Sequence, residues 1–379
     1  MKFIHLSDLH LGKRVNDYSM LDDQKYILNS ILGIINEQKP DGVIIAGDVY
    51  DKSVPSAEAV ALFDDFLVKL AKRRLEVFVI SGNHDSPERI AFGSRIMQQS
   101  GIHMSPVYDG NIKPVTLTDS FGKLNVYMLP FIRPADVRRF FEDEEILSYT
   151  DAVRCAVKHM DINTGERNII VAHQFVTGAS RCESETISVG GTDNVDAVVF
   201  DGFDYVALGH IHSPQNCGSP NVRYCGTPLK YSFSEAKDTK SVTVVEFLEK
   251  GNVSFSTAEL VPLHDLVEIK GTYSEVTAKP FYENTSWTED YMHIILTDEE
   301  DIPYATGKLR TIYHNLMKLD YDNKRTRSNN IISISDDTKA KSPFEWFSEL
   351  YELQNDQPMS KEQADIINSL IGKLWEEDI

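Results

Sequence analysis

Short apolar segments alternate with longer amphipathic ones in the first hundred residues. Residues 2–6, 43–46 and 77–80 are rich in aliphatic and β-branched side chains, as buried strands are. Residues 19–38 and 56–74 lie between them and are long enough for helices; in the second, the apolar positions recur at helical spacing. The order strand–helix–strand–helix–strand predicts a parallel sheet, and ligands bind such sheets beyond the carboxyl ends of the strands.

Further strands follow, interrupted by one helix and one long loop. We expect strands at residues 115–117, 124–129, 168–172 and 205–208, a helix at 145–159, and a functional loop at 174–200. Three later segments have the pattern of strands in a second, antiparallel sheet: residues 222–225, 241–247 and 253–256. These elements complete a first domain, residues 1–262.

The pattern changes near residue 262 and again near residue 336. A small α+β domain is predicted by alternating strands and helices at residues 267–269, 274–281, 292–296, 303–318 and 331–334. The polar run at residues 336–341 is typical of a linker. Two amphipathic helices follow within residues 343–375, the second with a capping box formed by Ser360 and Gln363. We therefore expect two further domains, residues 263–335 and 342–379.

The composition is that of a soluble globular protein. Apolar residues make up 41% of the chain and charged residues 25%, and neither a secretory leader nor a run of 18 apolar residues is evident. The four cysteines have no CxxC spacing, so we expect reduced thiols in a cytoplasmic protein. The formal net charge of −20 argues against a protein that coats DNA through a basic surface.

Side chains of the kinds that bind metals stand at the ends of the predicted strands. The candidates are Asp8, His10, Asp48, Asn83, His173, His210 and His212. Because the carboxyl ends of parallel strands meet at one edge of a sheet, we expect these side chains to converge. A lone Asp-x-His or His-x-His is a common coincidence. The prediction depends on five such clusters, each following an apolar strand.

Two carboxylates, one amide oxygen and four imidazoles form a mixed donor set. Such a set suits Mn²⁺, Fe²⁺ or Zn²⁺ better than Ca²⁺, and it lacks the thiolates of a structural zinc site. Seven donors exceed what one ion takes from a protein while it also holds a substrate. The set therefore predicts two ions about 3.5–4 Å apart that share one carboxylate. Asp48, which follows the second of the three strands, is the candidate for the shared ligand.

These clusters resemble those of the calcineurin-like metallophosphoesterases. The family motifs DxH, GDxxD, GNHD, a histidine after a strand, and GHxH occur here at residues 8–10, 47–51, 82–85, 173 and 209–212. Residues 5–12, 207–212, 224–228 and 231–235 are also similar to the nuclease subunits of bacterial SbcCD-type complexes. The resemblance implies an α/β fold: a metallophosphoesterase-type β-sandwich flanked by helices, a small α+β cap that binds DNA, and a C-terminal helical pair.

Carried onto this chain, the resemblance implies two metal sites and a catalytic histidine. One ion would be held by Asp8, His10, Asp48 and His212, and the other by Asp48, Asn83, His173 and His210. His84 would face the scissile phosphate and stabilise or protonate the leaving oxygen. Asp85 would orient His84 or one of the ligands. Asp51 stands where related nucleases have a histidine, so we interpret it as a carboxylate behind the ligands or as a helix cap.

The implied activity is that of a Mn²⁺-dependent DNA nuclease, with Mg²⁺, Fe²⁺ or Zn²⁺ as other candidate ions. Such nucleases degrade double strands from the 3′ end and cut single strands and hairpins during DNA repair, recombination and replication. The implied partners are DNA, a coiled-coil ATPase of the SbcC type that binds the helical tail, and a second copy of the chain. Pairing through residues 56–100 would give a homodimer within a heterotetramer, located in the cytoplasm at the nucleoid.

Two other functions are compatible with the same residues. A phosphatase or phosphodiesterase for small molecules or phosphoproteins would share the metal site but would need neither the cap nor the tail. A non-catalytic scaffold would be expected to lack some ligand, and none of the seven is missing. The remaining histidines are expected to be structural or at the surface: His5, His103, His159, His264, His293 and His314. The tail helices could also fold back on the body.

Overall fold

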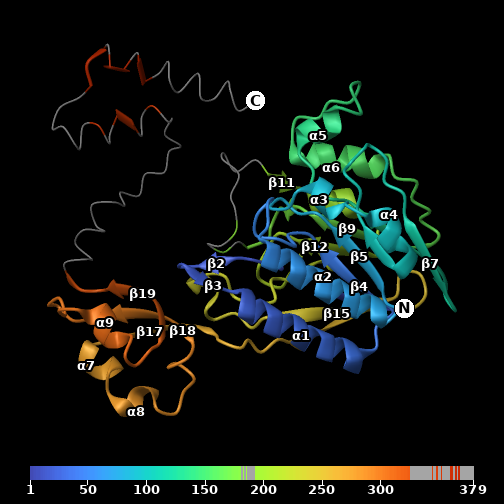
Figure 1. Ribbon diagram of the computed structural model, residues 1–379. Helices are drawn as coiled ribbons and strands as arrows, with labels where there is room; N and C mark the ends of the chain where they lie inside the picture. The colour runs from blue at the N-terminus through green and yellow to red at the C-terminus, as the bar shows by residue number, and fades with distance from the viewer. Residues whose placement is uncertain are drawn as a thin grey trace. The chain divides into compact units, whose positions relative to one another are not determined.

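A computed structural model describes residues 1–180, 182, 185 and 193–324, together with single positions between 344 and 367. The chain divides into two compact units, residues 1–321 and 322–379, and the first contains all of the named strands and helices. Figure 1 labels many of these elements along the chain.

The first sheet contains the three strands predicted at the N-terminus. Its order is β16 (Val253–Glu259), β15 (Ser241–Phe247), β1 (Lys2–Leu6), β4 (Gly42–Ala46), β5 (Glu76–Ile80) and β6 (Ile102–Met104). Strands β1, β4, β5 and β6 are parallel, as the strand–helix alternation predicts, and β15 and β16 are antiparallel to their neighbours. The carboxyl ends of β1, β4 and β5 therefore lie side by side.

A second sheet faces the first. Its order is β13 (Gln215–Cys217), β14 (Ser219–Tyr224), β12 (Tyr205–Gly209), β9 (Arg167–His173), β8 (Gly122–Met128) and β7 (Val115–Asp119). The inner faces of the two sheets share one apolar cluster, in which Phe3 and Phe78 of the first sheet accompany Ile169 and Tyr205 of the second. The predicted β-sandwich is thus present.

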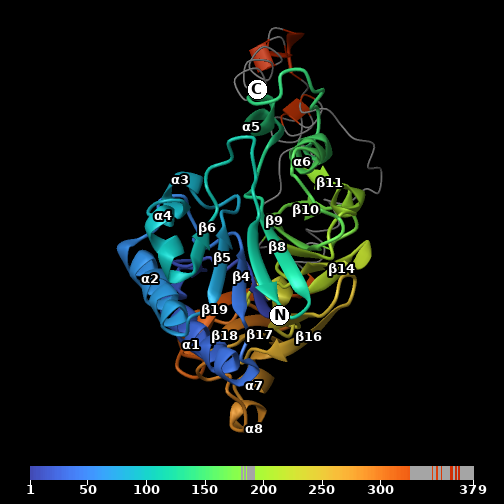
Figure 2. The ribbon, with the colours of Figure 1, turned by 90° about the vertical axis from the view of Figure 1, so that its right-hand side faces the viewer.

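Helices cover the outer faces of the sandwich, so the domain has four layers (Figure 2). The first sheet packs against α1 (Leu21–Gln38) and α2 (Ala57–Lys72), and the second packs against α6 (Tyr149–Lys158). Strands covered on both faces are apolar throughout, which explains why the early strands lack alternation. Ser56 accepts a hydrogen bond from the Ala59 amide at the start of α2, and Ser148 and Asp151 form a capping box at the start of α6.

Two predictions about the sandwich were wrong in detail. We expected residues 222–225, 241–247 and 253–256 in one antiparallel sheet, but β14 is parallel to β12 in the second sheet, whereas β15 joins β1 in the first. The predicted loop at residues 174–200 contains two short paired strands, β10 (Phe175–Val176) and β11 (Asn194–Val195). An apolar pattern specifies a strand but not its partner, which tertiary packing selects.

Short elements connect these layers. The helices are α3 (Pro87–Ile90), α4 (Ser94–Met97) and α5 (Pro134–Arg138), the 3₁₀ turns are η1 (Gln98–Ser100), η2 (Ala197–Phe200) and η3 (Phe233–Glu235), and one hairpin pairs β2 (Arg14–Val15) with β3 (Tyr18–Ser19). The η3 turn belongs to the segment at residues 231–235 noted in the sequence.

A small three-stranded sheet follows the sandwich. It contains the parallel strands β17 (Leu266–Gly271), β18 (Tyr291–Leu296) and β19 (Asn315–Tyr321), with α7 (Tyr273–Val276), α8 (Lys279–Tyr282) and α9 (Ala305–Leu309). The helix predicted at residues 303–318 was wrong: α9 ends at Leu309 and β19 begins at Asn315. The helix predicted at residues 274–281 is split, because Pro280 cannot continue α7.

The tail is described only at single positions. Ser360 and Gln363 exchange hydrogen bonds between each side chain and the other's amide, so the predicted capping box is present. The strand predicted at residues 331–334, the linker at 336–341 and most of the tail helices lie outside the described residues.

Candidate metal centre

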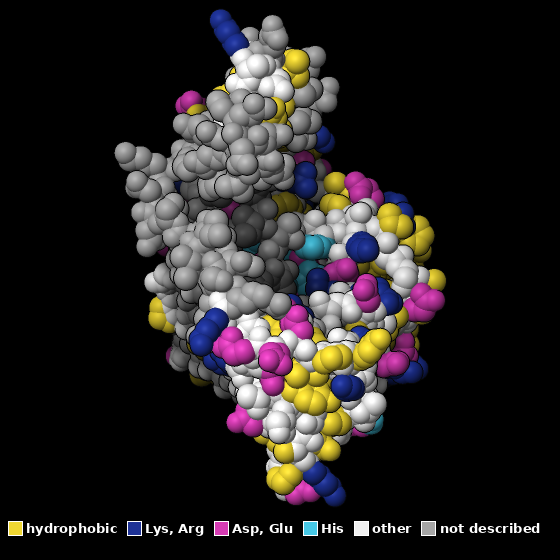
Figure 3. All heavy atoms as spheres, turned by 90° about the vertical axis from the view of Figure 1, so that its left-hand side faces the viewer, with side chains coloured by type: hydrophobic (Ala, Val, Ile, Leu, Met, Phe, Trp, Pro, Cys, Tyr) yellow, Lys and Arg dark blue, Asp and Glu magenta, His cyan; other side chains and the backbone are white. Residues whose placement is uncertain are grey.

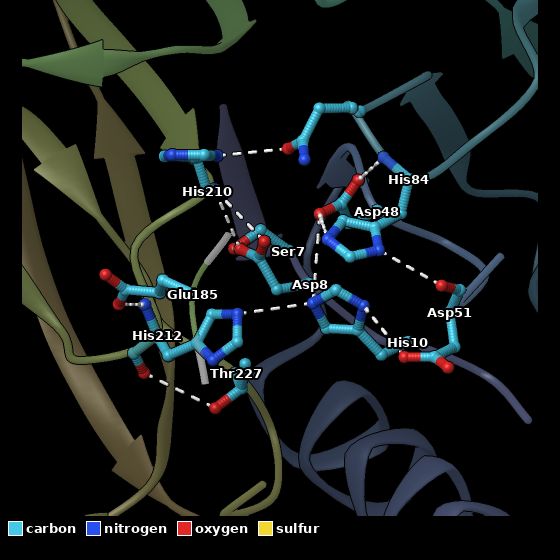
Figure 4. A network of polar contacts seen from close by, with 12 residues as sticks. Ser7, Asp8, His10, Asp48, Asp51, His84, Glu185, His210, His212 and Thr227 are labelled. Carbon is cyan, nitrogen blue, oxygen red and sulfur yellow. Dashed lines mark hydrogen bonds and ion pairs between the residues drawn. The ribbon is translucent and has the colours of Figure 1, made fainter. Parts of the chain in front are cut away.

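All seven candidate ligands lie together at the carboxyl ends of strands from both sheets. Figure 4 labels Asp8, His10, Asp48, His210 and His212 among them. The first sheet supplies Asp8 and His10 after β1, Asp48 after β4, and Asn83 after β5. The second sheet supplies His173 at the end of β9, and His210 and His212 after β12. Histidine side chains are visible in a hollow on the face that Figure 3 shows. The cluster is therefore built at the seam between the sheets.

Backbone hydrogen bonds connect the ligand-bearing loops beyond the ends of the paired strands. The amide of Asp8 donates to the Gly47 carbonyl at 3.0 Å, and the amide of His10 donates to the Asp48 carbonyl at 3.0 Å. The amide of His210 lies 3.1 Å from both carboxylate oxygens of Asp8, which links the two sheets. The loops that carry these ligands are therefore hydrogen-bonded to one another, which fixes their relative positions.

Asp85 connects two of these loops through its carboxylate. It accepts hydrogen bonds from the amides of Val49 at 3.1 Å, Tyr50 at 2.9 Å and Gly82 at 2.9 Å. Burial, followed by the Asp48 charge, raises the pKa of Asp85 to about 6, against the effect of these three donors. These contacts favour a role in positioning the Asp48 loop over a role in orienting His84.

Four of the candidate ligands have backbone conformations that non-glycine residues seldom adopt. Their φ angles are positive: 52° for Asp8, 43° for His10, 49° for Asp48 and 97° for His210. Each costs on the order of 1–3 kcal/mol, and such residues cluster at functional sites. Two glycines of the motifs are required by close packing: a Cβ at Gly82 would collide with Asp48, and a Cβ at Gly209 would collide with the Ala46 carbonyl. The loops can approach each other only because both residues are glycine.

One half of the cluster contains His10 and His212. Their Nε2 atoms lie 3.2 Å apart, and the Asp48 Oδ2 atom lies 3.8 Å from His10 Nε2. The carboxylate of Asp8 is close enough to both imidazoles for the three to hold one ion. This half brings together the residues that the resemblance assigns to the first ion.

The other half contains His173, Asn83 and His210. The Asn83 Oδ1 atom lies 3.0 Å from His173 Nε2 and 3.0 Å from His210 Nδ1. His173 Nε2 also lies 3.3 Å from the Asp48 Oδ2 atom, so the Asp48 carboxylate adjoins both halves. The structure therefore brings together the residues that the resemblance assigns to the second ion, and Asp48 lies between the two halves.

The donor atoms converge in a way that fits cations. His173 Nδ1 donates to the Ala46 carbonyl at 2.8 Å, so in the neutral ring Nε2 presents its lone pair to the oxygens of Asn83 and Asp48. Lone pairs that face one another in a buried space repel unless a proton or a cation lies between them. Buried carboxylates, imidazoles and an amide oxygen are the donors that divalent first-row metals accept.

The pKa values of the histidines show which imidazoles carry a proton when no metal cation is bound. Burial alone would lower the pKa of His173, but the adjacent Asp48 carboxylate outweighs it and raises the pKa to about 9. Burial likewise opposes protonation of His212, whose contacts with Cys182 and Glu235 raise its pKa to about 10. Burial holds the pKa of His10 well below its usual value. Protons on His173 and His212 must therefore leave before these imidazoles can bind a metal.

We expect divalent ion binding to strengthen as the pH rises. From pH 6.5 to 8.5, affinity should increase by up to about tenfold per pH unit for each ion that displaces an imidazole proton. The sign follows from the raised pKa values of His173 and His212, which keep both rings protonated at neutral pH. Calorimetric titration with Mn²⁺ in two buffers of different ionisation enthalpy measures the protons released. Affinity that is independent of pH, without proton release, would contradict this assignment.

His84 lies at the rim of the cluster. Its Nδ1 atom is 3.0 Å from the Asp51 carbonyl oxygen, and its Nε2 atom is 4.0 Å from the Asp48 Oδ2 atom. The ring stands edge-on to His10, and about a quarter of the side chain is exposed. Asp51 turns its carboxylate toward Lys13 at 2.8 Å and lies 3.9 Å from His10 Nδ1. Asp51 does not cap α2, since Ser56 does, so only the interpretation as a carboxylate behind the ligands remains.

Sequence reasoning missed several residues that hold the ligands. Ser7 donates to the Asp8 carboxylate, Gln24 donates to the His10 carbonyl at 2.7 Å, and Glu185 accepts from the His212 amide at 2.7 Å. Ser7 is adjacent to Asp8 and lies in the segment at residues 5–12 that carried part of the family resemblance, but Gln24 and Glu185 are 14 and 27 residues from their partners and follow no motif. Glu235, whose side chain adjoins His212, lies in the segment at residues 231–235 that carried part of the family resemblance.

The other histidines mostly bond to nearby groups, as structural histidines do. His5 is buried between the sheets, 3.0 Å from the Tyr205 hydroxyl. The others have these neighbours: Glu76 for His103, the Cys155 carbonyl for His159, Asp23 for His264, Glu268 and Asp320 for His293, and Glu289 for His314. The described cysteines form no disulfide. Among the described helices, none has the length and apolar character needed to cross a bilayer.

Comparisons with known proteins agree with this geometry. The family model described as calcineurin-like phosphoesterase matches residues 1–214, and the one described as type 5 capsule protein repressor C-terminal domain matches residues 262–355. A protein from Staphylococcus epidermidis, named as the SbcD subunit of nuclease SbcCD, is 30% identical over 385 residues, covering 100% of both chains. Its namesake from Staphylococcus saprophyticus is 33% identical over 84% of each chain.

A solved structure of a dimetal phosphatase from Danio rerio aligns with 68% of this chain and 95% of its own, at 11% identity and a TM-score of 0.43. Its similarity is much weaker than that of the two staphylococcal proteins. The family model covers more than half of the chain, and one relative matches it from end to end. The chain therefore belongs to the calcineurin-like phosphoesterases, in the group of the SbcD nuclease subunits.

Proposed function

We propose that this chain is the nuclease subunit of an SbcCD-type complex and hydrolyses DNA phosphodiesters with two divalent ions. The observation that carries the proposal is the convergence of seven metal-type donors from both sheets, with His84 at the rim. The full-length similarity to an SbcD nuclease subunit supports DNA over a small-molecule substrate. A phosphatase would need only the sandwich, whereas the match at residues 262–355 extends beyond it.

The residues would divide the work as follows. Asp8, His10 and His212 would hold one ion, Asn83, His173 and His210 the other, and Asp48 would contact both. When bound, such an ion pair supplies an ionised water as nucleophile and neutralises the charge of the phosphate. His84 would stabilise or protonate the leaving oxygen with Nε2, while its Nδ1–H donates to the Asp51 carbonyl.

Manganese is the ion that we propose. The cluster offers more oxygen donors than a zinc site usually has and more imidazoles than magnesium usually accepts. Mn²⁺ accepts both donor types in octahedral geometry. Fe²⁺ shares this preference and is the second candidate.

The C-terminal tail would bind a coiled-coil ATPase of the SbcC type. Phe347 and Ile366, at helical positions in the tail, each expose roughly half of their surface, and burying that exposed half on a partner is worth about 1 kcal/mol each. Helix-in-groove docking would cover them. Deletion of residues 340–379 should therefore abolish co-purification with the ATPase and leave ion binding intact. Calorimetry that finds unchanged affinity between the truncated chain and the ATPase would refute this role.

A second copy of the chain would pair through the surface near α3 and α4. Phe92 is 82% exposed and Ile96 is 76% exposed in this segment, which lies within residues 56–100. Contiguous exposed apolar surface marks interaction sites, and two large exposed side chains within one short segment make this surface the candidate. Light scattering should find a homodimer at micromolar concentration that Phe92→Asp together with Ile96→Asp converts to a monomer. A wild-type monomer would contradict the proposal.

The function is tested by comparing substrates. With Mn²⁺, the chain should degrade linear duplex DNA from 3′ ends and cut hairpins and single strands, and a partner ATPase with ATP should stimulate cleavage. It should hydrolyse p-nitrophenyl phosphate and cyclic nucleotides poorly. Efficient hydrolysis of those small substrates without DNA cleavage would favour the phosphatase alternative, and no hydrolysis of any substrate would favour the scaffold. The nuclease function would place the protein in the cytoplasm, at the nucleoid.

A further inference from the structure

A buried ion pair lies directly behind His212. The Glu235 side chain is fully buried, and its Oε2 atom accepts a hydrogen bond from Lys240 Nζ at 2.6 Å. Lys240 is also buried, 4% exposed, and donates to the backbone carbonyl of His212 at 2.9 Å. The other carboxylate oxygen of Glu235 lies 3.8 Å from His212 Nδ1. One ion pair therefore contacts His212 at both its ring and its backbone.

Stability alone is a weak explanation for this pair. Removing two charges from water costs free energy that their attraction often fails to recover, so apolar replacements of buried ion pairs are frequently neutral or stabilising. This pair is distinguished by its position beside a candidate ligand: Glu235 lies next to Nδ1 of His212, the ring nitrogen that points away from the cluster. The other ring nitrogen of His212, Nε2, points into the cluster and lies 3.2 Å from His10 Nε2. Metal-binding histidines usually direct their second nitrogen to a carboxylate or a carbonyl, which fixes the ring and its tautomer.

We propose that Glu235, held by Lys240, is a positioning residue that orients His212 for metal binding. The carboxylate favours the tautomer with the proton on Nδ1, so that the Nε2 lone pair faces the metal site. The Lys240 ammonium, 2.6 Å from the Glu235 carboxylate, supplies the opposite charge that this buried carboxylate needs and holds it in place. Lys240 and the Thr227 amide, at 3.0 Å, together hold the His212 carbonyl.

Cys182 is the competing neighbour, because its thiol also lies close to His212 and Glu235. A neutral thiol is a weak acceptor and cannot select a tautomer as a carboxylate can. Replacement of Cys182 by serine should therefore leave ion binding nearly unchanged. This contrast separates the role of the carboxylate from that of the thiol.

The test is a measurement of ion binding, and it rests on the proposed function only for the identity of the ion. Mn²⁺ titrations should show that the double variant Glu235→Gln, Lys240→Met binds one of the two ions about 10–100-fold more weakly, with the other unchanged. The double change removes both charges and leaves neither partner as a lone buried ion. The expected change in cleavage is a higher Mn²⁺ requirement, with much of the rate restored at saturating Mn²⁺.

Asp119→Asn is the control, because it breaks the Arg167–Asp119 ion pair, which contacts none of the candidate ligands. It should lower the melting temperature without altering ion binding. A folded double variant that binds both ions with wild-type affinity would overturn the inference, as would a wild-type chain that binds no divalent ion. A wild-type chain that binds two ions but does not cleave DNA would contradict the nuclease function and leave this inference standing.

Discussion

Replacing His84 by alanine should abolish DNA cleavage while both ions remain bound. We expect the rate at saturating Mn²⁺ to fall by about 10²–10⁴-fold, the usual contribution of a general acid or a comparable charge stabiliser. His84 Nε2 lies 4.0 Å from the nearest Asp48 oxygen, whereas His173 Nε2 lies 3.3 Å from it. The His84 side chain is partly exposed to solvent, and that of His173 is buried. His84 therefore faces the space where substrate would lie.

Two measurements separate this role from metal binding. Elemental analysis should find two ions in the His84→Ala protein, and its Mn²⁺ affinity should match that of the wild type. His314→Ala is the control, because His314 is exposed and bonds to Glu289, which is no part of the cluster, so cleavage should not change. Loss of an ion from the His84 variant would instead make His84 a ligand and refute the catalytic role.

Replacing Asp48 by alanine should remove both ions or leave one weakly held. The Asp48 carboxylate adjoins His10 in one half of the cluster and His173 in the other, at 3.8 and 3.3 Å. Water cannot replace a shared carboxylate on two ions at once. We expect at least about a hundredfold loss of Mn²⁺ affinity and a loss of cleavage as complete as that of the His84 variant.

The metal-free variant must be shown to fold. Burial alone would raise the pKa of Asp48, but His173 and its other neighbours hold that pKa well below its usual value. The ionised carboxylate therefore stabilises the metal-free fold at neutral pH, and this contribution is lost only as the pH falls through the lowered pKa. Asp48→Asn keeps the shape if alanine unfolds the protein. Asp65→Asn is the matched control and should keep both ions, because this exposed carboxylate pairs with Lys69 on α2 and contacts none of the candidate ligands. An Asp48 variant with full occupancy and activity would disprove the shared ligand.

The sequence predicted the elements that carry the cluster better than it predicted their neighbours. Strands β1, β4 and β5 are apolar on both faces, and polar residues follow each of them directly, so both strand and site are visible locally. The place of β15 beside β1 was not visible, since Val244 and Val245 would suit either sheet of a sandwich. Partner choice there depends on packing between segments far apart in the chain.

The residues that support the ligands were the least predictable. Glu185 and Lys240 contact His212 from positions 27 and 28 residues away in the chain. Each reaches the site through a hydrogen bond to backbone, for which many side chains would have suitable chemistry. Only the folded loops determine which side chains these are, and no spacing rule exists for them. The helix predicted at residues 303–318 failed for a related reason: pairing with β18 selects a strand at residues 315–321, against local periodicity.

The position of β15 has a consequence for synthesis of the chain. On the ribosome, Asp8, His10, Asp48 and Asn83 emerge early, but their three histidine counterparts from the second sheet come more than eighty residues later. Strand β1, which precedes two of the early ligands, gains its second neighbour only when residues 241–247 have emerged. A chain that terminates prematurely before this point therefore has an incomplete first sheet. Failed translation products should be unable to cut the genome, because the nuclease centre matures only after most of the sandwich has been made.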